Sequence, residues 1–360
     1  MANKKEMKKM KNIVIYLLTI CLVAISCFSC SNTEEAEKRF PLVQELKAIE
    51  VPINEIIKLS SIYKLKDYII LRDGSENCDV FFYVYKNPDF QFLYSFAKRG
   101  QGPKEYRSPS VIGNTPDNFF SFRDYNIFTT YQLSDTASTF INSYKIPPID
   151  RGFLLTGLNQ IDDSLFLTKH QSNKWTRREL INLYTHEIID FIPNTFNLEK
   201  KLGRDYYTTF EESIVTSNNK RFAYGYFLID LIEFGSIQNN KIVITNRVGM
   251  KKNPTFYLYE TGRQGSQYKF NVLHNTVYYS DIRCGNNYVY ALYANIPMGD
   301  LKNEQASLIE VYMWDGSAIA LFKLDKDISS FVVDEDMQTI YGFNTEKNED
   351  YLYAFKFNIE

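Results

Sequence analysis

From Phe40 onward the chain alternates between short runs of aromatic or aliphatic residues and polar turns, with little helical periodicity. Such runs, bounded by Asp, Asn and Gly, are typical of β-strands, because successive side chains of a strand point to opposite faces. One unit recurs: a polar dipeptide leads into a strand of aromatic and aliphatic residues. The six dipeptides are Lys66-Asp67, Asp117-Asn118, Asp162-Asp163, Asn218-Asn219, Asn286-Asn287 and Glu335-Asp336. Their second residues lie 45 to 68 positions apart, which is near the length of a four-stranded blade in a kelch-type array.

After the sixth unit only one more strand-like run follows, Tyr351 to Phe357, so the sixth blade is short of an outer strand. The segment Leu42 to Val51 precedes the first unit and can supply it. Closure of the ring protects sheet edges that otherwise invite aggregation. We therefore expect an all-β domain over residues 40–360, a six-bladed β-propeller closed by pairing of its N-terminal and C-terminal strands. A β-sandwich or an irregular β-solenoid is the alternative.

Composition supports this fold and excludes one class of partner. Tyr and Phe occur 27 times each, against 16 Gly, and both favour the half-buried surface of a pleated sheet. The formal net charge is −2, with both signs interspersed along the chain. Because a nucleic-acid partner requires a basic stripe or patch, we expect no nucleic acid as a partner.

The first thirty residues differ from the rest of the chain. Five lysines between positions 4 and 11 form a basic start, and residues 13–28 carry no charge. A basic region, a short apolar region and a small residue before a cleavage site are the parts of a secretory signal. The apolar stretch is shorter than the roughly 20 residues of a transmembrane helix. An N-terminal anchor helix that is never cleaved is the alternative.

The end of the apolar region resembles a bacterial lipobox, in which a diacylglycerol is attached to a cysteine and the chain is cut just before it. Ser29 precedes Cys30, and the polar chain begins directly after this cysteine. Cys27 is the alternative lipidation site. The resemblance implies a lipoprotein signal peptide over residues 1–29 and a lipidated tether over residues 30–39.

The acidic run Glu34-Glu35-Ala36-Glu37 follows the lipidation site directly. It resembles the export signal that Bacteroidetes surface lipoproteins carry behind the lipid. Two or three acyl chains on one cysteine give stable anchoring, since each buried methylene contributes about 0.8 kcal/mol. We therefore expect an outer-membrane lipoprotein of the cell envelope, exposed on the surface and joined to the membrane by its lipid.

Two cysteines, Cys78 and Cys284, lie beyond the signal and lipidation region. They are far apart in sequence, and a disulfide requires Cα atoms within about 7 Å of each other. We expect two separate thiols, with a bridge between them as the alternative.

A Gly-rich motif follows the strands of the first repeat, Lys98-Arg99-Gly100-Gln101-Gly102-Pro103-Lys104-Glu105-Tyr106. A loop of this composition, ending in Pro and Glu at this place, resembles the signature of the TolB-like six-bladed β-propeller lipoproteins of Bacteroidetes. The resemblance covers roughly residues 40–360 together with the lipobox. The repeats are uneven, and most blades lack a sharp signature. The resemblance therefore implies a fold and a cellular address rather than an activity.

Two interpretations of this loop remain open. Gly100 and Gly102 permit backbone angles closed to other residues, so the loop can serve to link two blades. Glu105 would then cap backbone N–H groups or pair with Arg99. In the other interpretation Arg99, Gln101 and Glu105 line the mouth of the central funnel and bind a ligand. A phosphate-cradling loop has little support, because no Lys-Ser/Thr pair and no helix follow.

A charged pair, Asp281 and Arg283, lies in a Tyr-rich run that precedes the fifth dipeptide. Side chains two positions apart on a strand share a face, so the pair either orients a ligand or forms a structural salt bridge. His170, His186 and His274 are isolated, and a metal site requires clustered ligands. We expect neither a metal nor another cofactor.

These observations favour a binding or scaffold module on the cell surface, whose partner is a glycan, a peptide or a protein. Tyr and Phe suit such contacts when they are exposed. A propeller lyase or hydrolase, with a polar or metal-assisted site in the central channel, is the alternative. Carboxylates that converge in the channel would favour catalysis, whereas aromatic side chains gathered on one rim would favour binding.

Overall fold

The computed structural model describes residues 37–113, 118–145, 154–162, 164–171, 176–185, 187–193, 213–218, 220–249, 258–261, 267–270, 272–301, 306–347 and 350–359. The expected signal peptide and both candidate lipidation sites, Cys27 and Cys30, lie outside the described residues. Within this part of the chain, no helix is long and apolar enough to cross a membrane.

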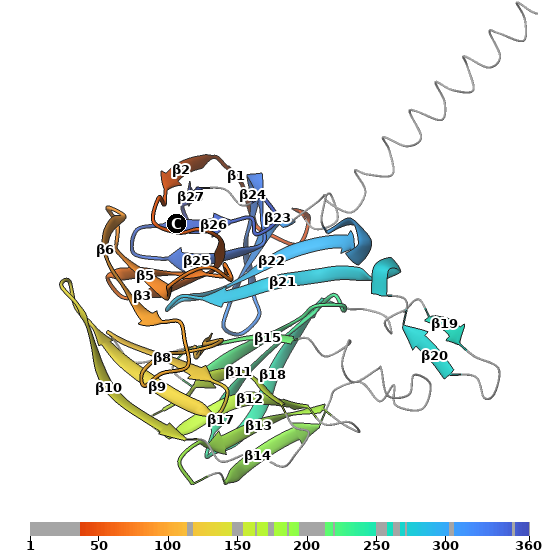
Figure 1. Cartoon of the computed structure of the whole chain (residues 1–360). Coiled ribbons are helices and arrows are strands. Elements are labelled where there is room, and N and C mark those ends of the chain that lie inside the picture. The colour runs from red at the N-terminus through yellow and green to blue at the C-terminus, as the bar shows by residue number, and fades with distance from the viewer. Residues whose placement is uncertain are drawn as a thin grey trace, which may run out of the picture.

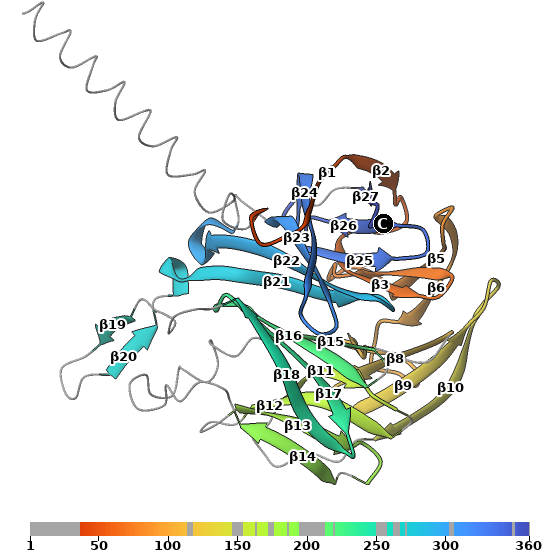
Figure 2. The same cartoon turned by 180° about the vertical axis from the view of Figure 1, so that it is seen from behind.

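Six antiparallel sheets are fanned around a common centre (Figures 1 and 2), which confirms the predicted six-bladed β-propeller. Blade 1 consists of β3 (Leu59–Leu65), β4 (Tyr68–Asp73), β5 (Val80–Lys86) and β6 (Gln91–Lys98). Blade 2 consists of β7 (Ser110–Val111), β8 (Phe119–Asp124), β9 (Ile127–Leu133) and β10 (Ser138–Lys145). Blade 3 consists of β11 (Leu154–Gln160), β12 (Leu165–Gln171), β13 (Thr176–Asn182) and β14 (Ile188–Pro193).

The remaining blades follow the same strand order. Blade 4 consists of β15 (Ser213–Asn218), β16 (Arg221–Tyr226), β17 (Leu231–Gln238) and β18 (Lys241–Gly249). Blade 5 consists of β21 (Thr276–Cys284), β22 (Tyr288–Pro297), β23 (Ala306–Met313) and β24 (Ala318–Ile328). Blade 6 contains β25 (Ser330–Asp334), β26 (Thr339–Phe343) and β27 (Tyr351–Lys356). Between blades 4 and 5 lie a hairpin, β19 (Leu258–Thr261) and β20 (Gln267–Phe270), and the short helix η1 (Val272–His274); a second, η2 (Met298–Asp300), follows β22.

The six polar dipeptides all fall between the first and second strands of a blade. The strands that follow them are β4, β8, β12, β16, β22 and β26. Asp117, Asp163 and Asn219 themselves lie outside the described residues. Asn118 has a positive φ of 63°, a conformation that Asn tolerates better than most residues. The repeat read from the sequence is therefore the first hairpin of each blade.

The N-terminal segment closes the ring, as the sequence predicted, but it does so as two strands rather than one. β2 (Ala48–Pro52) pairs with β27 in the antiparallel sense and supplies the outer strand of blade 6. β1 (Leu42–Leu46) instead pairs in parallel with β24 and becomes a fifth strand of blade 5. The chain changes sheet at Lys47, where Asp325 Oδ1 accepts a hydrogen bond of 2.9 Å from the N–H of Ala48.

The two faces of the ring follow from the antiparallel order within each blade. The turns between first and second strands and between third and fourth strands lie on one face, which we call the lower face. The turns between second and third strands lie on the opposite, upper face, together with the links from one blade to the next. The first strands line the centre, and those of blades 3, 4, 5, 6 and 1 contact one another in that order.

Aromatic side chains fill the wedges between blades. Between blades 1 and 2, the ring of Phe82 lies 4.9 Å from Phe120 and 5.4 Å from Phe122. Full burial of such a side chain contributes about 2–3 kcal/mol. The many Tyr and Phe residues are therefore used mainly to pack one sheet against the next. Cys78 is buried and Cys284 half-buried, and no disulfide joins them.

Candidate functional site

The Gly-rich loop links β6 of blade 1 to β7 of blade 2 on the upper face. Its Glu105 carboxylate accepts a hydrogen bond of 2.9 Å from the N–H of Gly102 and pairs at 3.0 Å with Nζ of Lys98. These contacts lower the pKa of Glu105, the backbone hydrogen bond being the larger cause. A Cβ on Gly100 would lie 2.0 Å from Oε2 of Glu105. A side chain here would displace the Glu105 carboxylate from its hydrogen bonds, and the φ of 157° is one that residues with a Cβ rarely adopt.

Arg99 holds the same loop against blade 1. Its Nη2 donates to the carbonyl oxygen of Ser75 at 2.7 Å and to Sγ of Cys78 at 3.1 Å. Its guanidinium carbon lies 4.4 Å from the centre of the Phe81 ring, within the range of a cation–π contact. Arg99 therefore interacts with blade 1, while Glu105 pairs with Lys98.

A row of exposed side chains lies on the outer side of this loop. Arg107 Nη2 donates to Oε1 of Gln101 at 2.9 Å, and the Arg107 guanidinium carbon lies 5.9 Å from the centre of the Tyr125 ring. Tyr125, in the turn between β8 and β9, is 68% exposed. Its φ of 53° is unusual for a bulky side chain. We call Gln101, Arg107 and Tyr125 the rim cluster.

Asp124, next to Tyr125, fixes the base of this cluster. Its carboxylate accepts hydrogen bonds from the N–H groups of Arg107 at 3.0 Å and Ser108 at 2.7 Å. Asp73 at the end of β4 does the same for Ile57 at 2.9 Å and Lys58 at 3.3 Å. Each aspartate thus ties the end of a second strand to the segment leading into the first strand of its own blade.

Sequence reasoning missed Arg107, Tyr125 and this clamp, and only the clamp left a signal in the sequence. Arg72-Asp73 and Arg123-Asp124 are the same dipeptide, separated by the spacing of the first two turn dipeptides. A search for a second motif at that spacing would have found both aspartates.

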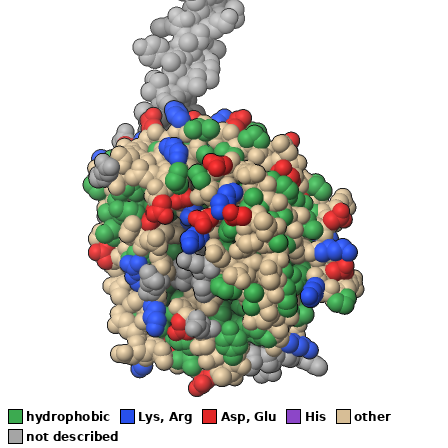
Figure 3. Space-filling view, turned by 90° about the vertical axis from the view of Figure 1, so that its left-hand side faces the viewer, with side chains coloured by type: hydrophobic (Ala, Val, Ile, Leu, Met, Phe, Trp, Pro, Cys, Tyr) green, Lys and Arg blue, Asp and Glu red, His purple; other side chains and the backbone are tan. Residues whose placement is uncertain are grey.

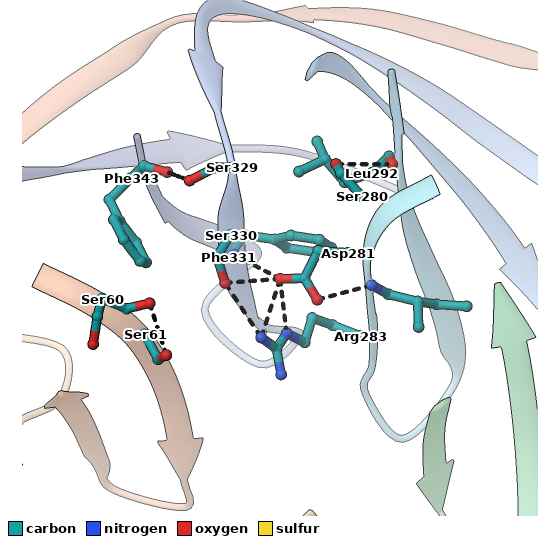
Figure 4. A network of polar contacts seen from close by, with 11 residues as sticks. Ser60, Ser61, Ser280, Asp281, Arg283, Leu292, Ser329, Ser330, Phe331 and Phe343 are labelled. Atoms are coloured by element: carbon teal, nitrogen blue, oxygen red, sulfur yellow. Dashed lines mark hydrogen bonds and ion pairs between the residues drawn. The ribbon is translucent and has the colours of Figure 1, made fainter. Parts of the chain in front are cut away.

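Asp281 and Arg283 lie on the inner strand of blade 5 (Figure 4). Oδ2 of Asp281 accepts from Nη2 of Arg283 at 3.0 Å, from Oγ of Ser330 at 2.8 Å and from the N–H of Phe331 at 3.2 Å. Oδ1 accepts from the N–H of Ile282 at 2.9 Å. Both carboxylate oxygens are therefore engaged, and the contacts join β21 to β25 of blade 6.

The Arg283 side chain keeps 30% of its surface exposed. Figure 4 shows Ser60 and Ser61 of β3 across from its guanidinium. Since Oγ of Ser330 also accepts a hydrogen bond of 3.3 Å from Nη2 of Arg283, the guanidinium is held in place from one side. We call Asp281, Arg283 and Ser330 the channel network. It connects blades 5 and 6 and leaves the guanidinium of Arg283 partly exposed toward the centre.

The predicted ligand-binding residues thus lie in two places, the Gly-rich loop and the inner strand of blade 5. Arg99 and Glu105 have their side chains in contacts within blade 1 and its loop, and Gln101 belongs to the rim cluster. Asp281 and Arg283 belong to the channel network. Among the described residues, no group of three or more His, Cys, Asp or Glu side chains could hold a metal ion. On the face seen in Figure 3, acidic and basic side chains lie beside one another.

These features define a six-bladed β-propeller with exposed polar and aromatic side chains on a rim. Residues 57–336 match the family described as TolB-like 6-blade propeller-like. The chain belongs to this family. No curated protein matches the sequence.

Two solved structures are similar to this chain at low sequence identity. A candidate exported protein of Bacteroides fragilis is 12% identical, with a TM-score of 0.55 over 88% of this chain and 99% of that one. The β-propeller domain of Cps50 (Swd1) from Myceliophteria thermophila is 8% identical, with a TM-score of 0.48 over 86% of this chain and 100% of that one.

Proposed function

We propose that this protein is an outer-membrane lipoprotein, anchored through Cys30, whose propeller binds a glycan at the rim cluster. The observation that carries the binding site is Tyr125, a 68% exposed ring held at positive φ beside Arg107. Bulky residues keep such a conformation at a cost of order 1–3 kcal/mol, and these outliers gather at functional sites.

A glycan suits this arrangement better than a peptide does. A sugar ring has an apolar face of C–H groups surrounded by hydroxyls. The exposed face of Tyr125 can stack on the apolar face of the sugar. The guanidinium of Arg107 and the side-chain amide of Gln101 supply hydrogen-bond donors for the hydroxyls. Because the Arg107 side chain donates to Gln101 and its backbone is held by Asp124, part of the entropy cost of ordering this residue is met before binding.

The cellular address is supported by the sequence and by one relative. The basic start and the uncharged stretch at 13–28 have the pattern of a secretory signal, and the Ser29-Cys30 site resembles a lipobox. The propeller from Bacteroides fragilis is described as a candidate exported protein. Incorporation of labelled palmitate tests the anchor: we expect it to be lost in Cys30→Ala and kept in Cys27→Ala.

A glycan and peptide array, probed with the unlipidated chain from Ser31 onward, tests the binding site. We expect glycan binding that Tyr125→Ala and Arg107→Ala each weaken by about tenfold or more, as for a central interface residue. Tyr184→Ala removes another exposed tyrosine, on blade 3, and is the matched control. Unchanged binding in Tyr125→Ala, or binding to peptides alone, would contradict the proposal.

A catalytic channel has less support. Both oxygens of Asp281 already accept hydrogen bonds from Arg283, Ser330 and two backbone N–H groups. A general base needs an oxygen within reach of the substrate, so Asp281 serves better as a support for Arg283.

A further inference from the structure

The chain is fixed to the propeller from Glu37 onward, before the first strand begins. Glu37 forms an ion pair with Lys323 of β24. Arg39 forms a second with Glu310 of β23, at 2.6 Å. Phe40 is only 6% exposed, and its ring lies 5.4 Å from that of Tyr312. We call residues 37–40 the N-terminal clasp.

The clasp lies between blades 4 and 5. Phe40 packs in the cluster that joins these blades, with Phe234 from blade 4 and Tyr312 and Trp314 from blade 5. Trp314 begins the turn between β23 and β24 and donates at 3.3 Å to the carbonyl oxygen of Asn286, in the turn between β21 and β22. Both turns belong to the lower face, so Phe40 lies toward that face. Glu37 instead contacts Lys323, which pairs with Leu308 nearer the upper face, so the clasp runs along the side of blade 5 between the two faces.

The rim cluster lies on the other side of the ring. Gln101 and Arg107 are in the link between blades 1 and 2, and Tyr125 is in a second-to-third-strand turn of blade 2. In a ring of six blades, blades 1 and 2 stand opposite blades 4 and 5. Figure 1 shows blades 1 and 2 at the left and the red N-terminal segment beside β23 at the right. The rim cluster and the clasp are therefore separated by the width of the ring.

The length of the tether limits how the propeller can turn. Seven residues lead from Cys30 to Glu37, and they span at most about 25 Å in any conformation. A compact domain of this size has a radius of gyration of about 20 Å and is therefore about 50 Å across. The tether is too short to bring the far side of the ring to the membrane.

We propose that the lipid surface faces blades 4 and 5 and that the rim cluster always points away from it. This inference rests on the proposed lipid anchor at Cys30, but not on glycan binding. The partner of the face around the clasp is the phospholipid surface itself, and the binding rim remains open to ligands from the medium.

Fluorophores at two exposed serines test this orientation. Ser317→Cys lies in the turn between β23 and β24 of blade 5, and Ser143→Cys lies on β10 of blade 2; Cys284→Ser removes the half-buried native thiol. The full lipidated protein is reconstituted in phosphatidylethanolamine and phosphatidylglycerol vesicles whose headgroups carry a quencher. We expect strong quenching of the label at 317 and none above the lipid-free level at 143.

A longer tether supplies the control. A flexible Gly/Ser insertion of about 30 residues between positions 36 and 37 has a root-mean-square span of about 30 Å and a far longer maximum reach. It should reduce the difference between the two labels. Equal quenching of both labels in the vesicle-bound protein with its native tether would overturn the orientation. Absence of both palmitate and vesicle binding would instead overturn the anchor, and the inference with it.

Discussion

Arg39 and Glu310 form an ion pair of 2.6 Å although 271 residues separate them in the chain. The Glu310 side chain is fully buried, and it also accepts hydrogen bonds from the hydroxyls of Tyr279 at 3.0 Å and Tyr312 at 2.7 Å. Burial raises the pKa of Glu310, and the Arg39 guanidinium opposes that rise. The N-terminal clasp thus supplies the positive charge that a buried carboxylate of blade 5 requires.

Blade 4 also buries a glutamate, and its cationic partners come from the blades themselves. Glu233 on β17 is equally buried and pairs with Arg178 of blade 3 and, at 2.7 Å, with Arg247 of its own blade. Tyr226 donates to it at 2.8 Å. Both glutamates lie on third strands and face the preceding blade. The source of the cation differs, since blade 5 takes it from the N-terminal segment.

Arg39→Met should therefore destabilise the propeller. Loss of one partner leaves a buried charge and costs up to 3–5 kcal/mol in buried pairs; because Arg39 stays one-third exposed, we expect about 2–3 kcal/mol. Urea unfolding of the chain from Ser31 onward measures this loss in the free energy of unfolding. Lys47→Met removes a 76% exposed cation that lies 3.8 Å from Asp325 and should cost no more than about 0.5 kcal/mol. Equal effects of the two changes would contradict the role of Arg39.

The raised pKa of Glu310 predicts a dependence of stability on pH. Above the ordinary value of 4.5, the folded protein keeps a proton on Glu310 that the unfolded chain has released. The free energy of unfolding contributed by this group therefore falls as pH rises from 4.5 through the folded pKa. Unfolding curves from pH 4.5 to neutrality should show a smaller fall in Glu310→Gln than in the unchanged protein. The exposed Glu45→Gln on β1 should leave the slope as it is.

Tyr125 can be used to separate binding from backbone strain. Glycine adopts positive φ freely, whereas alanine does not, so Tyr125→Gly should be about 1 kcal/mol more stable than Tyr125→Ala. Both variants lack the ring and should lose glycan binding equally. Thermal unfolding and a binding titration on the same samples make the comparison. Binding retained by either variant would remove Tyr125 from the site.

The close approach of Gly100 and Glu105 predicts non-additive mutations. Gly100→Ala places a methyl group against the Glu105 carboxylate and should destabilise by about 1 kcal/mol or more. In Gly100→Ala with Glu105→Ala the clash with the carboxylate is removed and only Cβ of residue 105 remains nearby, at 3.2 Å, so the double variant should lose less than the sum of the single losses. A four-member unfolding cycle tests this, and additive losses would show that the carboxylate does not lie over the glycine.

Asp281 should matter for stability more than for rim binding. Asp281→Ala leaves the partly buried guanidinium of Arg283 and the N–H of Phe331 without their acceptor, and we expect a loss of about 2–3 kcal/mol. Ser330→Ala removes a single hydroxyl from the same network and should cost about 1 kcal/mol. Glycan binding should remain in both. A loss of binding with unchanged stability would move the ligand site from the rim to the channel.

Much of the fold could be predicted because its signals are local. Each polar dipeptide forms the first turn of a blade, as at Asn118 before β8, and strand alternation marks the buried sheets. The segment from Leu42 to Val51 was correctly assigned to ring closure. Its division between two blades could not be foreseen, since it depends on Asp325, a distant residue that accepts from Ala48.

The candidate site was predicted only in part, because it too depends on contacts between residues that are distant in the sequence. The sequence singled out the Gly-rich loop and the pair of Asp281 and Arg283. Which side chains of the loop point inward was decided by contacts with other segments of blade 1, such as Arg99 with Ser75. Arg107 and Tyr125 lie near the motif but belong to no pattern that local spacing could indicate.

By itself, then, the sequence determined the strand content, the number of repeats and the turn at the start of each, because backbone preference and alternation act over a few residues. Tertiary structure alone decided that Arg39 neutralises Glu310 and that the chain leaves the ring opposite Tyr125. Charges buried between sheets must find partners wherever packing brings them, and that placement depends on the whole ring.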